Sequence, residues 1–427
     1  MKFKKKTLKN GVRVILVPME NSLTTTALVL TETGSKYETK NINGISHFLE
    51  HLCFKGTVKR PSSKVISEEL DGLGAQYNAF TGLEYTGYYA KAESRHLFRV
   101  LDVLSDIYLN STFPKEEIEK ERGVIVGEIE MYEDEPRRDI WDVLTDLLYG
   151  NQPAGWPITG TRDTVRRIKR EDIVSYKQKH YVASSTVVVV AGKYNEKEIV
   201  RAIQKAFSDI STSRKSGKKK TKDTQSKSRV VIKHKKTSQT HLVLGFRGYR
   251  AAHKDNAALS VLAAALGGCQ SSRLFHRIRN QLGSGYYVGA EHDALTDHGL
   301  LTIYTGVDNK RVMEILHAIL DEVRLIKQNP VSETELKKVK NYLIGGLFSG
   351  LETSHARAQF YGIEEMMVKK LKTPQERAQE IQAVSVEDVK RIAKNIFKLE
   401  KGSLALIGSV TSKSKQKFLS LLARNRF

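Results

Sequence analysis

The chain has 427 residues, of which 40% are hydrophobic and 28% are charged; this length and composition allow two or more domains with ordinary cores. Its two cysteines, Cys53 and Cys269, are too few for a disulfide framework or a thiolate zinc finger. The formal net charge of +22 is compatible with polyanion binding, so the distribution of this charge matters.

Much of the positive charge lies in one polar run. Between Arg214 and Lys236 the chain has eleven Lys or Arg residues and one Asp. No aromatic residue lies in this run, which argues against stacking on a single-stranded nucleic acid. A charge block this polar is typical of a solvated linker. We therefore expect a basic flexible linker at 211–229 and no nucleic-acid partner.

The sequence has no apolar stretch long enough for a membrane span, which takes about 18 residues or more. Its basic first residues are not followed by the apolar segment that a secretory signal requires. We expect a cytoplasmic protein without a membrane partner.

Periodic patterns before residue 150 predict both strands and helices. Apolar runs bounded by turn residues predict strands at 12–18, 25–32, 76–81 and 85–90. Helical periodicity predicts helices at 46–54, 62–73, 97–109, 115–132 and 139–148. Strands that follow one another through short connections favour antiparallel pairing. The pattern predicts an α+β fold, in which a mainly antiparallel sheet has its helices packed on one face.

The segments 168–192 and 384–408 share one pattern at a constant offset of 216 residues. Each has an acidic helix start, an amphipathic helix and an apolar strand ending in glycine, at Gly192 and Gly408. A match of this length without a gap indicates an internal duplication. We therefore expect two homologous halves, 1–210 and 230–427, on either side of the linker.

The segment from His47 to His51 carries the strongest chemical signal. Residues four apart lie on one face of a helix, so His47 and His51 can point at one metal ion. Glu50 can lie beside that ion without binding it. A hydrolytic zinc site needs two such imidazoles and a carboxylate that takes a proton from metal-bound water.

The alternative for this segment is a helix without a metal. Its apolar neighbours, which include Phe48 and Leu49, predict a buried helix, with Ser46 as a possible N-cap. Burying two imidazoles and a carboxylate together is costly without partners or a metal, which favours the metal site.

A catalytic zinc ion takes three protein ligands, so a third ligand is needed. The predicted helix at 115–132 offers Glu121, Glu128 and Glu130. Glu121 and Glu128 are seven residues apart, which places them on one face. Most acidic residues in such a run face solvent, and the spacing alone does not choose among the three.

These two segments resemble the M16 family of zinc metallopeptidases, the inverzincins, whose H-x-x-E-H order reverses the commoner H-E-x-x-H. The resemblance selects Glu128 as the third ligand, because the family has a Glu at a similar distance downstream. The run ERGVIVGEIEMYEDEP, which starts at Glu121, is similar to the family's second signature. Glu121 then matches a supporting acidic position beside the metal ligands.

Two further segments strengthen the resemblance. Asn78, Ala79 and Phe80 match the edge strand along which these enzymes bind their substrate. Arg279 and Tyr286, seven residues apart, match an Arg and a Tyr of the family's C-terminal signature. In the family these two side chains reach the active site, so the resemblance implies that they grip the peptide or donate to the developing oxyanion. The alternatives are a structural ion pair for Arg279 and simple packing for Tyr286.

The resemblance implies a LuxS/MPP-like metallohydrolase fold with one metal-bearing half and one metal-free half. At the offset of 216, the H-x-x-E-H segment falls on Ala263–Gly267, which has no imidazole. One Zn²⁺ per chain would be held by His47, His51 and Glu128, and Glu50 would take the proton of its bound water.

The implied activity is that of a zinc-dependent endopeptidase acting on peptides or unfolded segments. Family enzymes of this length also imply a homodimer or a heterodimer with a metal-free relative. Arg279 and Tyr286 would then act in the same chain or across the dimer. The alternative is a non-catalytic subunit that folds like a peptidase and binds peptides.

Overall fold

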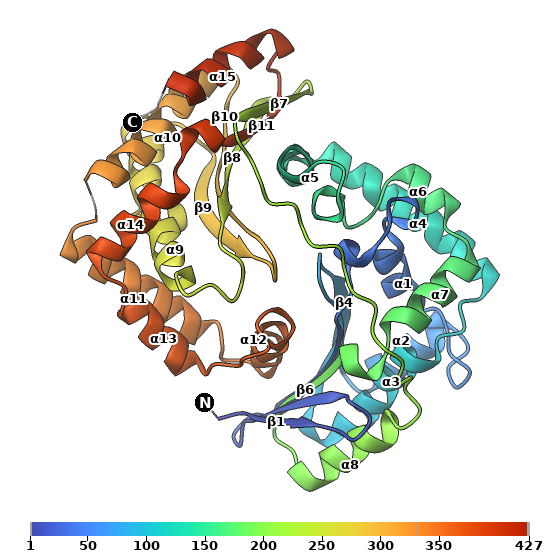
Figure 1. Ribbon diagram of the computed structural model, residues 1–427. Coiled ribbons are helices and arrows are strands. Elements are labelled where there is room, and N and C mark those ends of the chain that lie inside the picture. The colour runs from blue at the N-terminus through green and yellow to red at the C-terminus, as the bar shows by residue number, and fades with distance from the viewer. Residues whose placement is uncertain (1, 330, 425–427) are drawn as a thin grey trace. The chain divides into compact units, whose positions relative to one another are not determined.

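The structure is a computed structural model that describes residues 2–329 and 331–424. The chain forms two compact units, and neither is continuous in sequence. The first comprises the residues up to Glu130 with Trp156–Lys219 and Ser349–Thr373. The second comprises Met131–Gly155, Lys220–Phe348 and the residues from Pro374 onward. Figure 1 shows the course of the chain, with its helices and strands labelled.

The first unit is built on a six-stranded sheet with the order β1-β2-β6-β3-β5-β4. The strands are β1 (Lys4–Thr7), β2 (Arg13–Pro18), β3 (Thr24–Thr31), β4 (Gln76–Thr81), β5 (Thr86–Glu93) and β6 (Thr186–Gly192). Only β2 and β6 pair in parallel; the other neighbours are antiparallel. The four predicted strands are confirmed, whereas β1, whose residues are all exposed, has no apolar alternation to reveal it.

Helices cover both faces of this sheet. One face packs on α1 (Ile45–Cys53), α2 (Ser63–Gly72), α3 (Leu97–Asn110), α4 (Lys115–Asp134), α6 (Arg162–Arg167), α7 (Arg170–His180) and α8 (Glu196–Ala206). The opposite face packs on α12 (Ser354–Met367), where Ala358, Tyr361 and Met366 contact residues such as Ile15 and Leu28. These first-half helices lie on one face, as expected, and the opposite face is covered by a helix from the second half of the chain, which the expectation did not include.

The second unit repeats the arrangement with a five-stranded sheet of order β7-β11-β8-β10-β9. The strands are β7 (Arg229–His234), β8 (Gln239–Gly248), β9 (Tyr287–Ala294), β10 (Gly299–Asp308) and β11 (Ser403–Gly408). One face packs on α9 (Asn256–Ala263), α10 (Val312–Gln328), α11 (Glu333–Ser349), α13 (Pro374–Gln382), α14 (Val386–Ile396) and α15 (Lys415–Arg424). The other face packs on α5 (Pro136–Tyr149) through residues such as Leu144.

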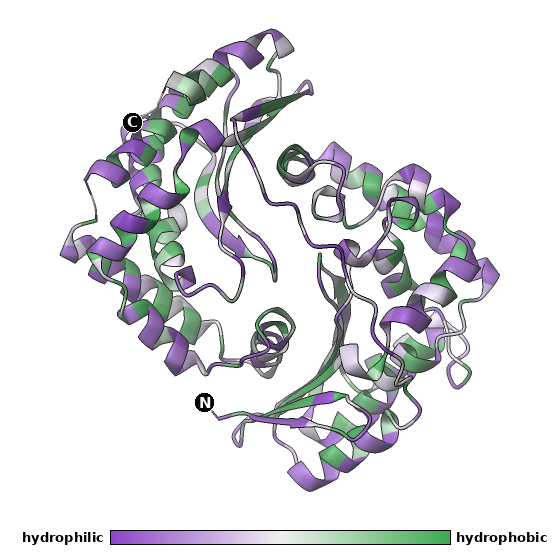
Figure 2. Cartoon of the chain, viewed as in Figure 1, coloured by the Kyte–Doolittle hydropathy of each residue, from purple (hydrophilic) through white to green (hydrophobic). Residues whose placement is uncertain are grey.

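The predicted duplication is visible in the topology. β6 is parallel to β2 and antiparallel to β3, and β11 is parallel to β7 and antiparallel to β8. The repeated helix–strand pattern therefore occupies the same place in both sheets. Hydrophilic and hydrophobic residues alternate around the helices in Figure 2, as expected for helices with one buried face.

The compact units differ from the continuous halves expected at 1–210 and 230–427. Helix α5 of the first half belongs to the second unit, and α12 of the second half belongs to the first. The strand sequences give the reason: β6 reads TVVVVAG and is buried at every position, so both of its faces need an apolar partner. In each unit, a helix from the other half of the chain packs on the second face of the sheet.

The basic connecting segment makes defined contacts. Lys215 Nζ lies 2.8 Å from Glu32 Oε2, and Lys218 pairs with Glu84, both in the first unit. Gln225 then bonds to Ser403 Oγ at 2.9 Å in the second unit. This differs from the flexible linker expected at 211–229, because Lys215 and Lys218 pair with acidic side chains and Gln225 is hydrogen-bonded. Among the described helices, none combines the length and apolar character needed to cross a lipid bilayer.

Candidate metal centre

Helix α1 is a core element that presents polar groups at one side. Its apolar residues Ile45, Phe48, Leu49 and Leu52 are fully buried, while His47 and Glu50 retain 8% and 9% exposure. The helix begins after Gly44, whose φ is +96°. A Cβ at Gly44 would also lie 2.6 Å from Thr159 O, so this position requires glycine.

The N-terminus of α1 is capped by Glu38 rather than by Ser46. The Glu38 carboxylate accepts from the amides of Gly44 at 2.8 Å and Ser46 at 2.9 Å. Ser46 Oγ instead bonds to Tyr176 Oη at 2.8 Å, so the expected Ser46 cap was wrong. A carboxylate seven residues before the helix leaves no local cap signature in the sequence.

We expect Glu38 to make the stability of the protein pH-dependent. Burial raises the pKa of Glu38 from 4.5 to about 7, against the hydrogen bonds that lower it. A carboxyl whose pKa is raised on folding stabilises fully below the unfolded value, and this contribution is lost as the pH rises through the folded value. The loss amounts to about 3 kcal/mol at most.

Urea unfolding of the wild type and Glu38→Gln at pH 5 and pH 8 measures this contribution. The wild type should lose more unfolding free energy between the two pH values than Glu38→Gln does. An equal loss in both proteins would contradict the pKa shift.

The predicted ligands come together in the first unit. His47, His51 and Glu128 each offer a ligand atom, and these atoms lie within 4.8 Å of one another; no other such group occurs in the part of the chain that is described. Glu128 Oε2, on α4, lies 3.6 Å from His47 Nε2 and 3.8 Å from His51 Nε2. The two imidazoles lie on one side of α1 because they are four residues apart. Helix α4 runs beside α1 and brings the Glu128 carboxylate to the same point.

The two imidazoles differ in protonation: His47 is held neutral, as a metal ligand must be, whereas metal binding at His51 has to displace a proton. Burial, with the neighbouring His51, lowers the pKa of His47 to about 4, so His47 is neutral near pH 7. Burial also lowers the pKa of His51, but the hydrogen bond to Glu121 and the nearby carboxylates outweigh it and raise the value. His51 Nδ1 lies 3.0 Å from Glu121 Oε2. Since a carboxylate only accepts, Nδ1 donates and Nε2 faces Glu128.

Glu121 is fixed from a second side. Lys55 Nζ lies 2.5 Å from Glu121 Oε1. Although burial raises the pKa of Glu121, its hydrogen bonds to His51 and Lys55 hold the pKa below the usual value. Glu121 therefore stays ionised beside His51, whereas Glu130, the third carboxylate considered, is exposed and lies 3.4 Å from Arg162 Nε.

Glu50 is placed next to the ligands. Burial raises its pKa, and the negative charge of Glu128 adds to this, while Thr81 and His51 oppose it. Thr81 Oγ1 donates to Glu50 Oε2 at 2.5 Å. A raised pKa strengthens a carboxylate as a proton acceptor, which is the direction that a general base requires.

The donor set fits a zinc ion. Two imidazole nitrogens and one carboxylate oxygen are the ligands of known catalytic zinc sites, and atoms bonded to one tetrahedral zinc ion lie roughly 3.3 Å apart. The separations of 3.6 and 3.8 Å are close to this value.

The predicted substrate-binding residues lie on β4, the last strand of its sheet. Asn78 is exposed, and Ala79 and Phe80 are half-buried. The Ala79 amide donates to Asn78 Oδ1 at 2.9 Å. The strand has β5 on one side, so its other side is an edge that can pair with an extended peptide.

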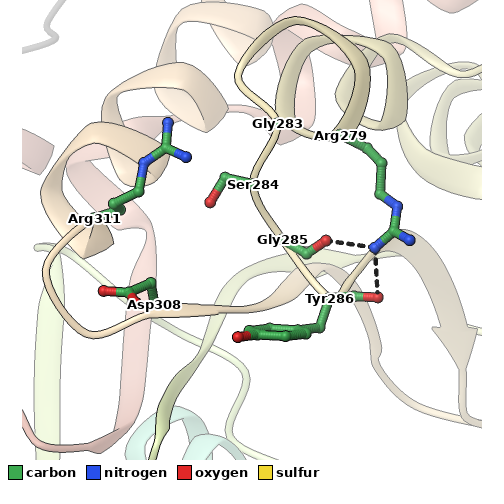
Figure 3. A pocket seen from close by; sticks show the side chains of 7 residues that line it. All are labelled: Arg279, Gly283, Ser284, Gly285, Tyr286, Asp308 and Arg311. Atoms are coloured by element: carbon green, nitrogen blue, oxygen red, sulfur yellow. Dashed lines mark hydrogen bonds between the residues drawn. The ribbon is translucent and has the colours of Figure 1, made fainter.

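Arg279 and Tyr286 belong to the second unit, where they line a cavity of about 590 Å³. Arg279 Nη1 donates to the carbonyls of Gly285 at 2.7 Å and Tyr286 at 3.0 Å, as Figure 3 shows. Tyr286 is 60% exposed. The two residues predicted to act together are therefore neighbours, and their role at the metal centre stays a prediction.

Sequence reasoning missed two residues of the site, Thr81 and Lys55. Thr81 directly follows Phe80 in the segment that resembles the substrate-binding strand, which was a usable signal. Lys55 follows α1 and has no distinguishing pattern. At the repeat offset of the H-x-x-E-H segment, Ala263 ends α9 and Ala264–Gly268 continues it as a π-helix made of Ala, Leu and Gly.

Comparison with known proteins supports the family assignment. Residues 13–162 match the family described as insulinase, peptidase family M16, and residues 167–343 match the peptidase M16 inactive domain. The chain is 36% identical over 408 residues to the uncharacterized zinc protease YmxG of Bacillus subtilis, covering 95% of this chain and 98% of that protein. An uncharacterized zinc protease of Streptomyces coelicolor is 30% identical, covering 98% and 92% of the two chains.

Solved structures share the fold. A protease from Helicobacter pylori has a TM-score of 0.91 at 23% identity and covers 95% of this chain and 99% of its own. A peptidase M16 inactive domain from Pseudomonas fluorescens has a TM-score of 0.89 at 18% identity, covering 96% and 99%. These structures show a shared fold, and the family models and the sequence relatives show that the chain belongs to the M16 family of peptidases.

Proposed function

We propose that this chain is a zinc-dependent endopeptidase that hydrolyses peptides or unfolded polypeptide segments. The observation that carries the proposal is the convergence of His47, His51 and Glu128 within 4.8 Å beside the buried carboxyl of Glu50. When bound, a zinc ion lowers the pKa of a coordinated water to about 7 and supplies a nucleophile at neutral pH.

Glu50 is the proposed general base. It takes a proton from the attacking water and delivers it to the leaving amine. Burial, the largest influence, raises its pKa, which is the direction expected of a carboxyl that accepts a proton and later releases it. Glu121 orients His51 through the bond to Nδ1, as carboxylates behind metal-binding histidines do.

The edge of β4 is the proposed substrate-binding strand. A peptide that pairs with Ala79 replaces the local bond from the Ala79 amide to Asn78 with main-chain hydrogen bonds. Such pairing depends little on the side chains of the substrate. Arg279 and Tyr286 are proposed to bind the peptide or stabilise the oxyanion, a role that rests on the family resemblance.

The assembly is proposed to be a homodimer or a heterodimer with a metal-free relative. One structural relative is described as part of complex III2 from Candida albicans, which fits an ability of this fold to work in complexes. Two lysines of the basic segment, Lys215 and Lys218, pair with Glu32 and Glu84, and this favours an internal role for these two over nucleic-acid binding.

The proposal is tested on the purified chain with elemental analysis and an internally quenched, unstructured peptide. We expect about one zinc ion per chain and cleavage that a chelator abolishes and added zinc restores. Light scattering on the same sample reports the oligomeric state. Bound zinc without cleavage of any peptide in a mixed library would instead favour a non-catalytic, peptide-binding subunit.

Replacing Glu121 by Gln should weaken zinc binding by about 10- to 100-fold. The amide can no longer provide the charged acceptor that fixes the His51 tautomer. Competition with a fluorescent zinc chelator measures the affinity. Glu119→Gln is the matched control, because Glu119 lies on the same helix but is exposed and pairs with Arg122. Equal affinity in both variants would contradict the orienting role.

A further inference from the structure

The carboxylate of Glu50 is held by one neighbour. Thr81 Oγ1 donates to Glu50 Oε2 at 2.5 Å, at the short end of the range for a hydroxyl bonded to a charged acceptor. Among the described residues this is the only hydrogen bond to the Glu50 side chain. Glu50 is 9% exposed, so its orientation depends largely on this contact and on packing.

We propose that Thr81 is a positioning residue for Glu50, an inference that rests on the proposed peptidase function. Its hydroxyl engages Oε2 and thereby leaves Oε1 as the oxygen that exchanges protons with water and the leaving amine. A carboxylate free to rotate about its last side-chain bond spends part of its time in unproductive orientations. A misplacement of about 1 Å can cost a hundredfold in rate.

The backbone around Thr81 is well fixed, as a positioning role requires. Thr81 ends β4 and pairs with Thr86 of β5. In the turn that follows, the Gly82 amide donates to the Tyr85 carbonyl at 2.8 Å. Thr81 is therefore anchored on the strand side and on the turn side.

A buried ion pair holds this turn in the first unit. Lys36 Nζ lies 2.7 Å from Glu84 Oε1, and the two side chains are 0% and 2% exposed. The Lys36 amide also donates to the Leu83 carbonyl at 2.9 Å. Lys218 of the basic segment pairs with the same Glu84. The turn that carries Thr81 thus has little freedom to move away from Glu50.

The alternative explanation for Thr81 is purely structural, because a β-branched residue is favoured in a strand whether or not its hydroxyl forms a hydrogen bond. Valine has the same shape and strand preference but lacks the hydroxyl. Serine keeps the hydroxyl and loses the methyl group. The two substitutions therefore separate the hydrogen bond from the fit of the side chain.

The test compares kcat and KM of the full-length, zinc-loaded protein on a quenched peptide. Thr81→Val should lower kcat by about 10- to 100-fold with KM changed less than about twofold, because the bond acts on Glu50 and leaves the β4 edge intact. Thr81→Ser should recover kcat to within about threefold of the wild type. Thr81→Ala also removes the hydroxyl, with a smaller side chain, and provides a second variant if Thr81→Val does not fold.

Thr86→Val is the matched control. Thr86 lies opposite Thr81 in the same hairpin, and its hydroxyl donates to the Thr33 carbonyl at 3.0 Å rather than to Glu50. This variant should keep the kcat of the wild type. Elemental analysis should find unchanged zinc in every variant.

Three results would overturn the inference. They are wild-type kcat in Thr81→Val, a kcat in Thr81→Ser as low as in Thr81→Val, or loss of zinc in Thr81→Val. If Glu50→Gln is inactive in the same assay, these results leave the proposed function intact. A zinc-loaded wild type that cleaves no peptide would overturn both.

Discussion

Glu50→Gln is expected to lower kcat/KM for peptide cleavage by about 10²- to 10⁴-fold, the usual contribution of a general base. Glutamine has nearly the same shape and can still accept from Thr81, so the fold and the hydrogen bond at Oε2 should persist. It cannot take a proton. Because Glu50 is not among the three predicted ligands, the variant should keep its zinc.

The matched control for this variant is Glu130→Gln, which makes the same chemical change at an exposed residue of α4. It should retain wild-type kcat/KM. Full activity in Glu50→Gln would refute the assignment of Glu50 as base. Loss of zinc in Glu50→Gln would also contradict it, since Glu50 would then act as a ligand.

His51→Ala is expected to abolish stoichiometric zinc binding and, with it, peptide cleavage. The substitution removes one of three ligands and also leaves Glu121 without its bond to Nδ1. Catalytic zinc sites of this kind have no spare protein ligand. Elemental analysis after dialysis should therefore find far less than one zinc ion per chain.

Thermal unfolding gives a second measure of the same prediction. Zinc stabilises the state that binds it, so a chelator should lower the melting temperature of the wild type but not of His51→Ala. His276→Ala is the control, because His276 is exposed in the second unit and lies outside the ligand group. Retained stoichiometric zinc in His51→Ala would refute the ligand assignment.

The local features of this protein could be predicted from its sequence. The spacing of His47 and His51 on an amphipathic helix, the four strands of the first half before residue 150 and the internal repeat each depend on residues close in sequence or on a constant offset. Structure and pattern agree there because helix and strand periodicity are set by backbone geometry. The family resemblance added Glu128, which spacing could not separate from Glu121 and Glu130.

The tertiary structure decided what depends on long-range packing. It placed Glu38 on the N-terminus of α1, Thr81 on Glu50 and Lys55 on Glu121, contacts that no local pattern encodes. It also placed α12 of the second half on the sheet of the first half, and α5 of the first half on the sheet of the second half. The reason is that the second face of each sheet is apolar and has to be covered. The sequence by itself determined the chemical groups of the candidate metal site. The surroundings of these groups depended on packing between residues far apart in the sequence, because buried apolar surfaces must cover one another.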